Sequence, residues 1–497
     1  MVEKILRLGK ETAVYGLSTV VGRLLNFLIV PFYANVLLPE ENGIIANIYA
    51  YIAFAAVVYG YGMEQAYMRF VATQELGDKK QNFTVAFLSL AGSSVLFSLV
   101  VSFFSAPIAS LIGLDSSQHK LVQYGAWILC FDTLSVVPFA SLRMQQRATK
   151  FASMKILNVS SNLILNIVLI VGFHWKTEGV FLANLLASVF TFGIMLNLVR
   201  EQLSFDLPGR LYKEILKFGL PYLPAGLSGV AMQVVDRPIV RALTNDATLG
   251  VYQLNYRLGI FMMLIVGMFD YAWKPFFLNH ASDPDAKQLF SKVFTYFLLA
   301  MSVIFLSVSL FIEDVVRISI FGRQFFPPAY WPGVQIVPYI LLSYIFTGAY
   351  VVFVVGVYIE KKTKYLPLVT GAGALVNVGM NFLLIPVYGI LGAALATLCS
   401  YIVMAVGMFF ASQRFYPVQY EWSKIARLSF IVAALFIGFR FLSPEPATTY
   451  GLILKLGLLG MFVAGLFVLD IVSMKEFVLT KSAILKTLTS PGKPPEA

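Results

Sequence analysis

Residues 10–43 read KETAVYGLSTVVGRLLNFLIVPFYANVLLPEENG, and residues 217–250, which lie 207 positions later, read KFGLPYLPAGLSGVAMQVVDRPIVRALTNDATLG. Extended to 10–70 over 217–277, the alignment needs no gap and holds nine identities. Most identities are residues that start or bend helices: Lys10/Lys217, Tyr15/Tyr222, Gly22/Gly229, Pro31/Pro238, Gly43/Gly250, Tyr49/Tyr256 and Gly60/Gly267. The pattern indicates a duplicated pair of helices and two equivalent halves.

The composition places both halves in a membrane. The chain is 58% hydrophobic and 13% charged, whereas a soluble domain has roughly 25% charged residues. Apolar runs of about 20 residues, long enough to cross a bilayer, lack the polar face of a soluble helix. We predict an all-α polytopic membrane protein with about fourteen spans, near 12–37, 44–69, 83–106, 120–142, 153–173, 179–199, 217–243, 249–274, 290–312, 332–358, 365–387, 389–411, 424–442 and 450–472.

The repeat also predicts how the spans are grouped. Because each repeat contains an even number of crossings, the halves share one orientation and are related by an axis along the membrane normal. We predict a six-helix N-terminal half over 1–205, a six-helix C-terminal half over 206–415, and two appended helices with a tail over 416–497. This plan is typical of transporters whose substrate path lies between the halves. In the appended part, Arg440 and Lys455 are expected to extend to the outer membrane surface.

Lys and Arg residues indicate the orientation. With the N-terminus in the cytoplasm, 27 of the 37 Lys and Arg residues fall on the cytoplasmic side, as the positive-inside rule favours. We therefore predict a multi-pass protein with both termini cytoplasmic, the loop 38–43 outside and the loop 360–364 inside. The same distribution accounts for the net charge of +11, so we predict no nucleic-acid surface.

Several kinds of chemistry are disfavoured by the residues present. Cys130 and Cys399 both lie in predicted spans and indicate neither a disulfide framework nor a metal site. His119, His174 and His280 fall on different loops, which disfavours a zinc site or a nucleophile–base pair. The chain has no G-x-x-x-x-G-K-[ST] loop, and its extramembrane segments are too short for a catalytic domain. We predict no enzymatic activity, no metal and no cofactor.

Two further patterns occur inside the spans. An asparagine pair at i, i+4 recurs near the end of each half, as Asn162 with Asn166 and as Asn377 with Asn381. Both amides of a pair lie on one helix face, where they either hydrogen-bond to a neighbouring helix or form a polar cavity wall. Four prolines predict bends in the first and seventh spans: Pro31, Pro221, Pro224 and Pro238.

Ionisable side chains within the spans need a partner or a function, since each costs roughly 2.5–3.5 kcal/mol at the bilayer centre. Their depth follows from the helical rise of about 1.5 Å per residue. The set comprises Arg23 and Asp132 near mid-membrane, Arg257, Asp236 and Arg237 towards the outside, and Glu64 and Asp270 near the cytoplasmic ends of their spans.

Several segments carry a family resemblance. ETAVYGLSTVVGRLLNFLIVPFYANVLLPEENG (11–43), GYGMEQAYMRF (60–70), LGVYQLNYRLG (249–259) and NVGMNFLLIPVYGILGAALAT (377–397) occur in this order along the predicted spans. Together they resemble the polysaccharide-transporter (oligosaccharide flippase) family of the multidrug/oligosaccharidyl-lipid/polysaccharide (MOP) superfamily. The resemblance covers nearly the whole chain. It implies two six-helix bundles around a central cavity, worked by alternating access on polyprenyl-diphosphate-linked oligosaccharides.

Two interpretations are open for Arg23 and Arg257. Arginine donates bidentate hydrogen bonds to phosphate and stays charged, so the pair predicts a cationic site for the diphosphate. The resemblance supports this, because related flippases have cavity arginines on the same two spans. Alternatively, each arginine is neutralised by an internal carboxylate and fixes packing. Asn26 and Tyr256 are candidates for contacts with sugar hydroxyls or for packing, and Arg237 is a candidate for the cavity mouth.

The carboxylates are candidates for coupling or gating. Asp132 is a candidate for proton or sodium coupling, with pairing to an arginine as the alternative. Asp236 precedes an arginine, but adjacent helical residues point about 100° apart and need not pair. Glu64 and Asp270, with Arg69, are candidates for a cytoplasmic gate or for ordinary interfacial solvation.

These observations predict a flippase that moves a lipid-linked oligosaccharide across the cytoplasmic (inner) membrane for biosynthesis of cell-surface polysaccharide, including lipopolysaccharide. Membrane lipid surrounds the protein, and a polysaccharide polymerase and glycosyltransferases are expected partners. The alternatives are an ion-coupled multidrug or small-molecule exporter and a lipid-linked peptidoglycan-precursor flippase of the same superfamily. The deep charges lean positive, which disfavours an exporter of cationic drugs.

Overall fold

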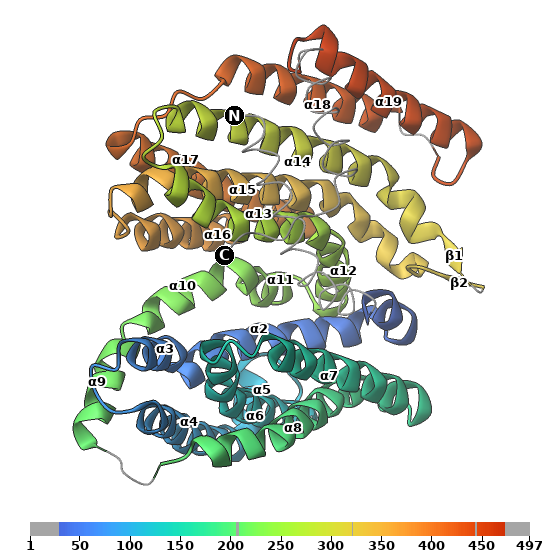
Figure 1. The fold of residues 1–497 in the computed structure, drawn as a ribbon. Helices are drawn as coiled ribbons and strands as arrows, with labels where there is room; N and C mark the ends of the chain where they lie inside the picture. The colour runs from blue at the N-terminus through green and yellow to red at the C-terminus, as the bar shows by residue number, and fades with distance from the viewer. Residues whose placement is uncertain (1–28, 205–207, 321, 443–444, 473–497) are drawn as a thin grey trace.

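A computed structural model of the chain consists of two helical bodies, one above the other in Figure 1. Within the described residues, 13 helical segments are long and apolar enough to cross a membrane. Each overlaps one of the spans predicted from residue 44 onward, but the predicted span 249–274 is divided at Gly259 and only its second part, Ile260–His280, is such a segment. The first predicted span, 12–37, falls largely outside the described residues. The chain is therefore an all-α polytopic membrane protein, as predicted. The structure describes residues 29–204, 208–320, 322–442 and 445–472.

The N-terminal body lies at the bottom of Figure 1, in blue to green. Its central helix is α6 (His119–Met144), which contacts α2, α3, α4 and α8. The helices that surround it are α2 (Pro39–Gly60), α3 (Met63–Thr73), α4 (Lys79–Phe103), α5 (Ser105–Leu111), α7 (Ala148–Asn166) and α8 (Lys176–Gln202), with the short turns η1 (Ser116–Gln118) and η2 (Ile167–Gly172).

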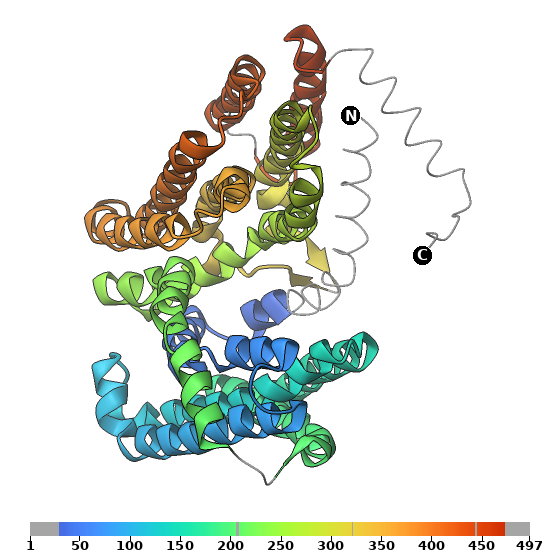
Figure 2. The same cartoon turned by 60° about the vertical axis from the view of Figure 1, so that its left-hand side comes forward.

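The C-terminal body lies above it, in green to orange. Its elements are α9 (Gly209–Gly219), α10 (Tyr222–Val234), α11 (Asp236–Leu243), α12 (Asp246–Leu258), α13 (Ile260–His280), α14 (Ala286–Arg317), the hairpin β1 (Ser319–Ile320) and β2 (Arg323–Gln324), η3 (Pro328–Ile336), α15 (Val337–Ile359), α16 (Tyr365–Tyr388) and α17 (Ile390–Phe415). Although α9 belongs to the C-terminal half of the sequence, it lies below the other elements of that half. It packs against α3 and α4 of the N-terminal body, as seen at the left of Figure 1 and again in Figure 2.

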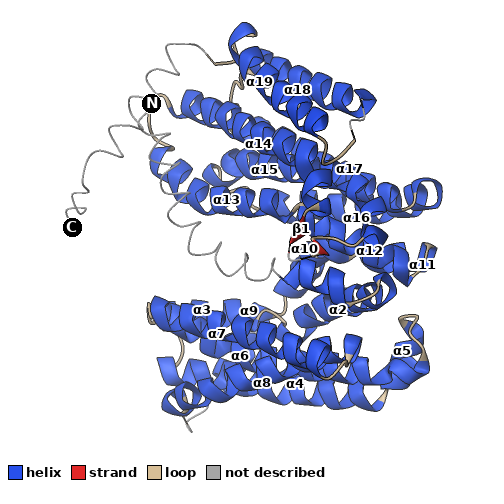
Figure 3. Ribbon diagram, turned by 90° about the vertical axis from the view of Figure 1, so that its right-hand side faces the viewer, coloured by secondary structure: helices blue, strands red, loops and turns tan. Residues whose placement is uncertain are grey.

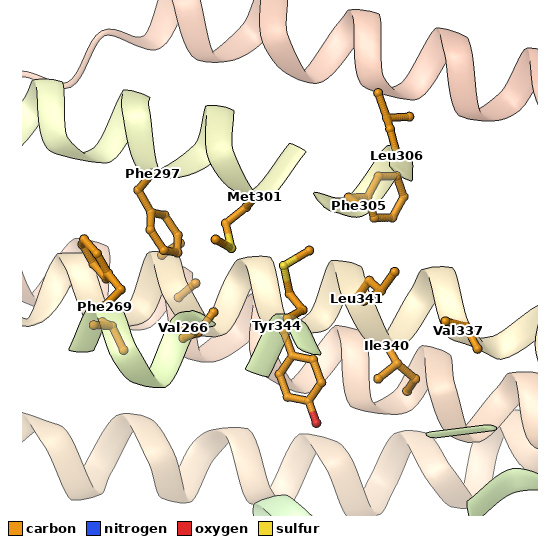
Figure 4. Close-up of a cluster of buried hydrophobic side chains, with 14 of the residues drawn as sticks. Val266, Phe269, Phe297, Met301, Phe305, Leu306, Val337, Ile340, Leu341 and Tyr344 are labelled. Carbon is orange, nitrogen blue, oxygen red and sulfur yellow. The ribbon is translucent and has the colours of Figure 1, made fainter. Parts of the chain in front are cut away.

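The core of the C-terminal body lies between α13, α14 and α15 (Figure 4). Phe269 and Phe297 are in ring contact there at 4.6 Å between centroids, and Met301 and Tyr344 are also buried. Interiors of this kind are close-packed and deform little, so the body is expected to move as a unit.

The two appended helices, α18 (Trp422–Leu442) and α19 (Thr449–Val468), pack on α14 and on each other. Lys455 of α19 was expected to extend to the membrane surface, and this expectation is wrong: the residue is 1% exposed. Its ammonium forms an ion pair with Asp314 of α14 at 2.5 Å. The charge is retained inside the protein because a carboxylate from a helix distant in sequence compensates it.

The seventh predicted span is bent where its prolines predict. It divides into α9, α10 and α11 at Leu220–Pro221 and at Val235. A proline ring clashes with the preceding helical turn and donates no hydrogen bond. Helices α10 and α11 accordingly begin beside Pro221 and with Pro238 in the first turn, which confirms these two predicted bends.

The bodies meet where α2 packs against α12, the equivalent helices of the repeat; Figure 3 shows the bodies from the side. A Cβ atom on Gly43 would collide with the backbone carbonyl of Asp246, and one on Gly250 would collide with that of Pro39. Asp246 is the repeat equivalent of Pro39, so each contact is the counterpart of the other. Reciprocal contacts of this kind arise at a two-fold axis, and the repeat axis therefore passes between the two glycines.

Side chains reinforce this junction. Arg241 donates to the backbone carbonyl of Ile112 at 3.1 Å and also to that of Gly113. Asn42 donates to the Tyr330 hydroxyl at 2.7 Å. These groups lie near the loop 38–43 and therefore on the side that the sequence predicts to be outside. We refer to this set of contacts, with the paired glycines, as the outer junction.

The asparagine pairs have the same geometry in both halves. Asn166 and Asn381 each donate to the backbone carbonyl four residues earlier, at 2.8 Å. In the first half the Tyr33 hydroxyl donates to Oδ1 of Asn166 at 2.7 Å, which confirms interhelical packing as the role of that amide. The repeat equivalent of Tyr33 is Val240, and Oδ1 of Asn381 has no partner among the described residues.

Candidate substrate site between the two halves

Arg257 lies on α12, seven residues or about two turns from Gly250 of the outer junction, and is partly exposed. Its electrostatic neighbours are the phenol groups of Tyr33 and Tyr49 from the N-terminal half and the guanidinium of Arg237. No carboxylate is among these neighbours within the described residues. A guanidinium inside a membrane with no compensating anion is available to bind an anionic ligand.

Arg237 lies on α11, and its side chain faces α12, the helix that carries Arg257. Its Nε donates to the Gln253 side chain at 2.6 Å, and its guanidinium lies 5.8 Å from the centre of the Tyr256 ring, within the range of a cation–π contact. Tyr256 itself is 8% exposed, and its hydroxyl lies 3.5 Å from that of Tyr344. The structure thus places Tyr256 in a packed aromatic layer beneath Arg237.

Asp236 does not pair with the adjacent arginine. It is 3% exposed, and its Oδ2 accepts a hydrogen bond from the Tyr252 hydroxyl at 2.5 Å. Its Oδ1 is buried and has no hydrogen-bond partner among the described residues. A buried carboxylate oxygen without a donor is costly, so this position favours an added hydrogen-bond donor or cation.

Asp132 lies on α6 in the N-terminal half and is exposed between helices. Its Oδ1 accepts a hydrogen bond from Ser188 of α8 at 2.7 Å. Its charged neighbour in the described part of the chain is Lys155 of α7, rather than the arginine expected as the alternative. The Lys155 ammonium lies 4.1 Å from the centre of the Phe139 ring.

The residues considered for a cytoplasmic gate are not brought together. Glu64 of α3 forms an ion pair with Arg143 of the same body. Asp270 pairs at 3.0 Å with Lys274, one turn along its own helix. The guanidinium of Arg69 lies 4.5 Å from the centre of the Phe218 ring on α9. Arg23 and Asn26 lie outside the described residues.

Sequence reasoning missed three groups beside Arg257 and Asp132. Tyr33 and Tyr49 face Arg257 from the other half, and Asn184 donates to the Tyr49 hydroxyl at 2.6 Å. Tyr49 is identical to its repeat equivalent Tyr256, which was the one available signal. The partnerships themselves join spans about 130 or more residues apart in the chain, and periodicity does not report such contacts.

A separate cavity of about 430 Å³ lies between α14, α15, α17 and α18. Its lining includes Phe305, Phe346, Phe409 and Trp422 and contains no charged side chain. In the part of the chain that the structure describes, no group of three or more His, Cys, Asp or Glu residues is placed to hold a metal ion. Arg257 and Arg237, with the tyrosines that neighbour Arg257, therefore form the strongest candidate site for an anionic substrate. We call this set the arginine layer.

Comparison with solved structures identifies the fold. The chain is similar to a lipid II flippase MurJ in an inward closed conformation, with a TM-score of 0.71 and 14% identity over 96% of this chain and 100% of that one. It is also similar to a multidrug resistance MATE family transporter of the MOP superfamily in an inward-facing conformation, with a TM-score of 0.63, 13% identity, and coverage of 79% and 94%. A MOP superfamily transporter from Pyrococcus furiosus matches with a TM-score of 0.54, 15% identity, and coverage of 83% and 95%.

Sequence comparison gives the family. No curated protein sequence matches this chain. The model of the family described as polysaccharide biosynthesis protein matches residues 8–280, which includes the first half, the linker and the first two spans of the second half. The resemblance inferred from the sequence motifs is thus confirmed. The chain belongs to the polysaccharide biosynthesis protein family.

Proposed function

We propose that this protein is a flippase that moves a polyprenyl-diphosphate-linked oligosaccharide across the cytoplasmic (inner) membrane for cell-surface polysaccharide biosynthesis. The observation that supports this most is Arg257. A guanidinium that meets tyrosines of the other half, with no carboxylate neighbour in the described chain, suits the diphosphate of such a lipid, because arginine binds phosphate through charge-assisted hydrogen bonds. Arg237 adds a second cation nearby, and Arg23 is proposed as a third.

The proposed cycle uses the two bodies as rigid units. The headgroup enters between them from the cytoplasmic side while the polyprenyl tail stays in lipid. In the described state the halves are joined at the outer junction, and opening this junction releases the headgroup outside. Glu64 and Asp270 are proposed to form new contacts on the cytoplasmic side when the outer junction opens, because their present partners, Arg143 and Lys274, belong to their own bodies.

Asp236 is proposed as the residue that couples transport to an ion. Its buried Oδ1 lacks a donor among the described residues, so binding of a cation there lowers the cost of burying the carboxylate. Asp236 also precedes Arg237 in α11. A cation bound at Asp236 would therefore act on the arginine layer. No bond in the substrate is made or broken in this scheme.

The remaining parts of the proposal follow from the proposed substrate. The protein is proposed to lie in the inner membrane with both termini cytoplasmic, as the Lys and Arg distribution favours. Glycosyltransferases supply the substrate, and a polysaccharide polymerase uses it on the other side. The similar MurJ and MATE structures share the fold at 13–14% identity. Between a lipid-linked diphosphate and a cationic drug, the positive charge of the arginine layer favours the diphosphate as the substrate.

Arg257→Gln tests the proposal. The substitution removes the charge and the bidentate donors, and hydrogen bonds to charged groups contribute about 1.5–3 kcal/mol, so affinity for undecaprenyl diphosphate should fall about tenfold or more. Binding is measured with purified full-length protein in lipid nanodiscs, and export is measured as surface polysaccharide in cells that depend on this protein. Arg200→Gln, an exposed position at the end of α8, is the matched control. Normal binding and export with Arg257→Gln would refute the assignment.

A further inference from the structure

Polar side chains of the N-terminal half form a continuous series from its cytoplasmic end to Arg257. Lys155 has Asp132, Glu64 and Arg143 as its electrostatic neighbours. Tyr49 in turn has both Asp132 and Arg257 as neighbours. Tyr49 of the N-terminal half is thus an electrostatic neighbour of both charges. We call Lys155, Asp132 and Tyr49, with their hydrogen-bonded neighbours, the polar track.

The track lies at membrane depth. Lys155 is seven residues into α7 and Asp132 thirteen residues into α6, which correspond to about 10 Å and about 20 Å along the helices. Both side chains are nevertheless exposed. Charges at such depth are typically retained where they pair with one another or face a polar space, which makes this pair a candidate for binding a polar ligand.

The neighbours of the two charges are fixed by hydrogen bonds within the N-terminal half. Ser188 donates to Asp132 at 2.7 Å, and Asn158 of α7 donates to Thr191 of α8 at 2.9 Å. Asn184, one turn before Ser188, donates to Tyr49 at 2.6 Å. Four helices, α2, α6, α7 and α8, thus hold the donors and acceptors of the track in set positions. Among the described residues, the hydrogen bond to Asp132 is accepted by Oδ1.

The chemistry of the track differs from that of the arginine layer. A carboxylate only accepts hydrogen bonds and an ammonium only donates them, whereas a sugar hydroxyl does both. Different hydroxyls of the sugar headgroup can therefore donate to Asp132 and accept from Lys155. A diphosphate, which only accepts, would be repelled by Asp132 and attracted by Arg257. The two ends of a lipid-linked sugar consequently suit two neighbouring sites.

We propose that Asp132 and Lys155 form a sugar-binding site for uncharged, hydroxyl-bearing sugars in the N-terminal half, and that Arg257 binds the diphosphate of the same molecule. The inference rests on the proposed function. It assigns the recognition of the sugar to one half and that of the phosphate to the other. The track also leads from the cytoplasmic end, beside Glu64 and Arg143, and so provides the route by which the headgroup reaches Arg257.

Two probes separate these roles: undecaprenyl diphosphate, and undecaprenyl diphosphate that carries N-acetylglucosamine. Wild-type full-length protein in nanodiscs should bind the sugar-bearing probe more tightly. Asp132→Asn should weaken binding of the sugar-bearing probe about tenfold, because one charge-assisted hydrogen bond is lost, and should not weaken binding of the sugar-free probe, because the diphosphate gains nothing from this carboxylate. Lys155→Gln should act in the same direction. Arg257→Gln should weaken both probes.

Lys150→Gln, exposed on the same helix as Lys155, is the control and should bind both probes as the wild type does. Equal affinity of the wild type for the two probes would overturn the sugar site, as would equal weakening of both probes by Asp132→Asn and Lys155→Gln, or no effect of either. Failure of the wild type to bind either probe would instead refute the proposed function, and the inference with it. Thermal unfolding of each variant shows that it is folded.

Discussion

Lys455 shows at the residue scale how a buried charge is retained in this protein. Its ammonium is enclosed between α14 and α19, pairs with Asp314, and lies 5.9 Å and 5.8 Å from the centres of the Phe311 and Phe439 rings. Asp314 also accepts a hydrogen bond from the backbone N–H of Ala447 at 2.8 Å. The pair thus joins the appended helices to the C-terminal body.

Lys455→Met should therefore destabilise the protein. Removing one partner of a buried ion pair costs about 3–5 kcal/mol because the other charge is left uncompensated, and the remaining hydrogen bond to Asp314 argues for the lower end. The free energy of unfolding in detergent measures this. Lys120→Met, an exposed lysine on α6, should have little effect, and Lys455→Met combined with Asp314→Leu should recover part of the loss. An unchanged stability of Lys455→Met would contradict the account.

The sequence predicted which residues carry unusual charge, but not their partners. Arg257 was recognised because arginine is costly within a span. Its neighbours Tyr33 and Tyr49 were not recognised, since tyrosine is common in membrane helices and the contacts join different halves. For Asp132 the expected arginine partner was replaced by Ser188 and Lys155. Only the arrangement of helices in space decides between such partners.

At the scale of elements, the paired glycines of α2 and α12 determine how closely the halves approach. Gly43 and Gly250 each face a backbone carbonyl of the other helix, and no side chain fits in that space. The sequence alignment showed both glycines as a repeated feature and predicted helix boundaries near them. It did not show that they contact each other's helix, because a repeat predicts equivalence and not contact.

Gly43→Ala and Gly250→Ala should each weaken the outer junction. An added methyl group in a tightly packed contact costs about 1–3 kcal/mol, measured as the free energy of unfolding. The double variant should lose less free energy of unfolding than the sum of the two single losses, because both substitutions separate the same pair of helices. Gly60→Ala is the matched control on α2, since a Cβ atom there meets no atom within 4 Å. Full stability of both single variants would show that the helices are not held at this distance.

At the scale of the whole molecule, the sequence predicted a larger share of the structure than it did for single residues or for contacts between helices. Duplication, hydrophobic runs and the Lys and Arg distribution together indicated the spans, and thirteen of them are present in the described residues. These features depend on composition along the chain, which the bilayer selects directly. The contact between the two bodies depends on which faces meet, and the sequence carries that information only through residues such as Gly43 and Gly250.

The central claim is that the protein moves a lipid-linked sugar by opening and closing the outer junction. Asn42 and Tyr330 are in contact across this junction, so cysteines at both positions, in a chain whose Cys130 and Cys399 are replaced by serine, can be joined with a short reducible thiol linker. The most direct measurement is transbilayer movement of fluorescent undecaprenyl-diphosphate-linked N-acetylglucosamine in liposomes that contain the Asn42→Cys, Tyr330→Cys protein. The account predicts movement before linking, none after linking, and recovery on reduction. Movement that continues after complete linking, or no movement by the unlinked protein, would contradict it.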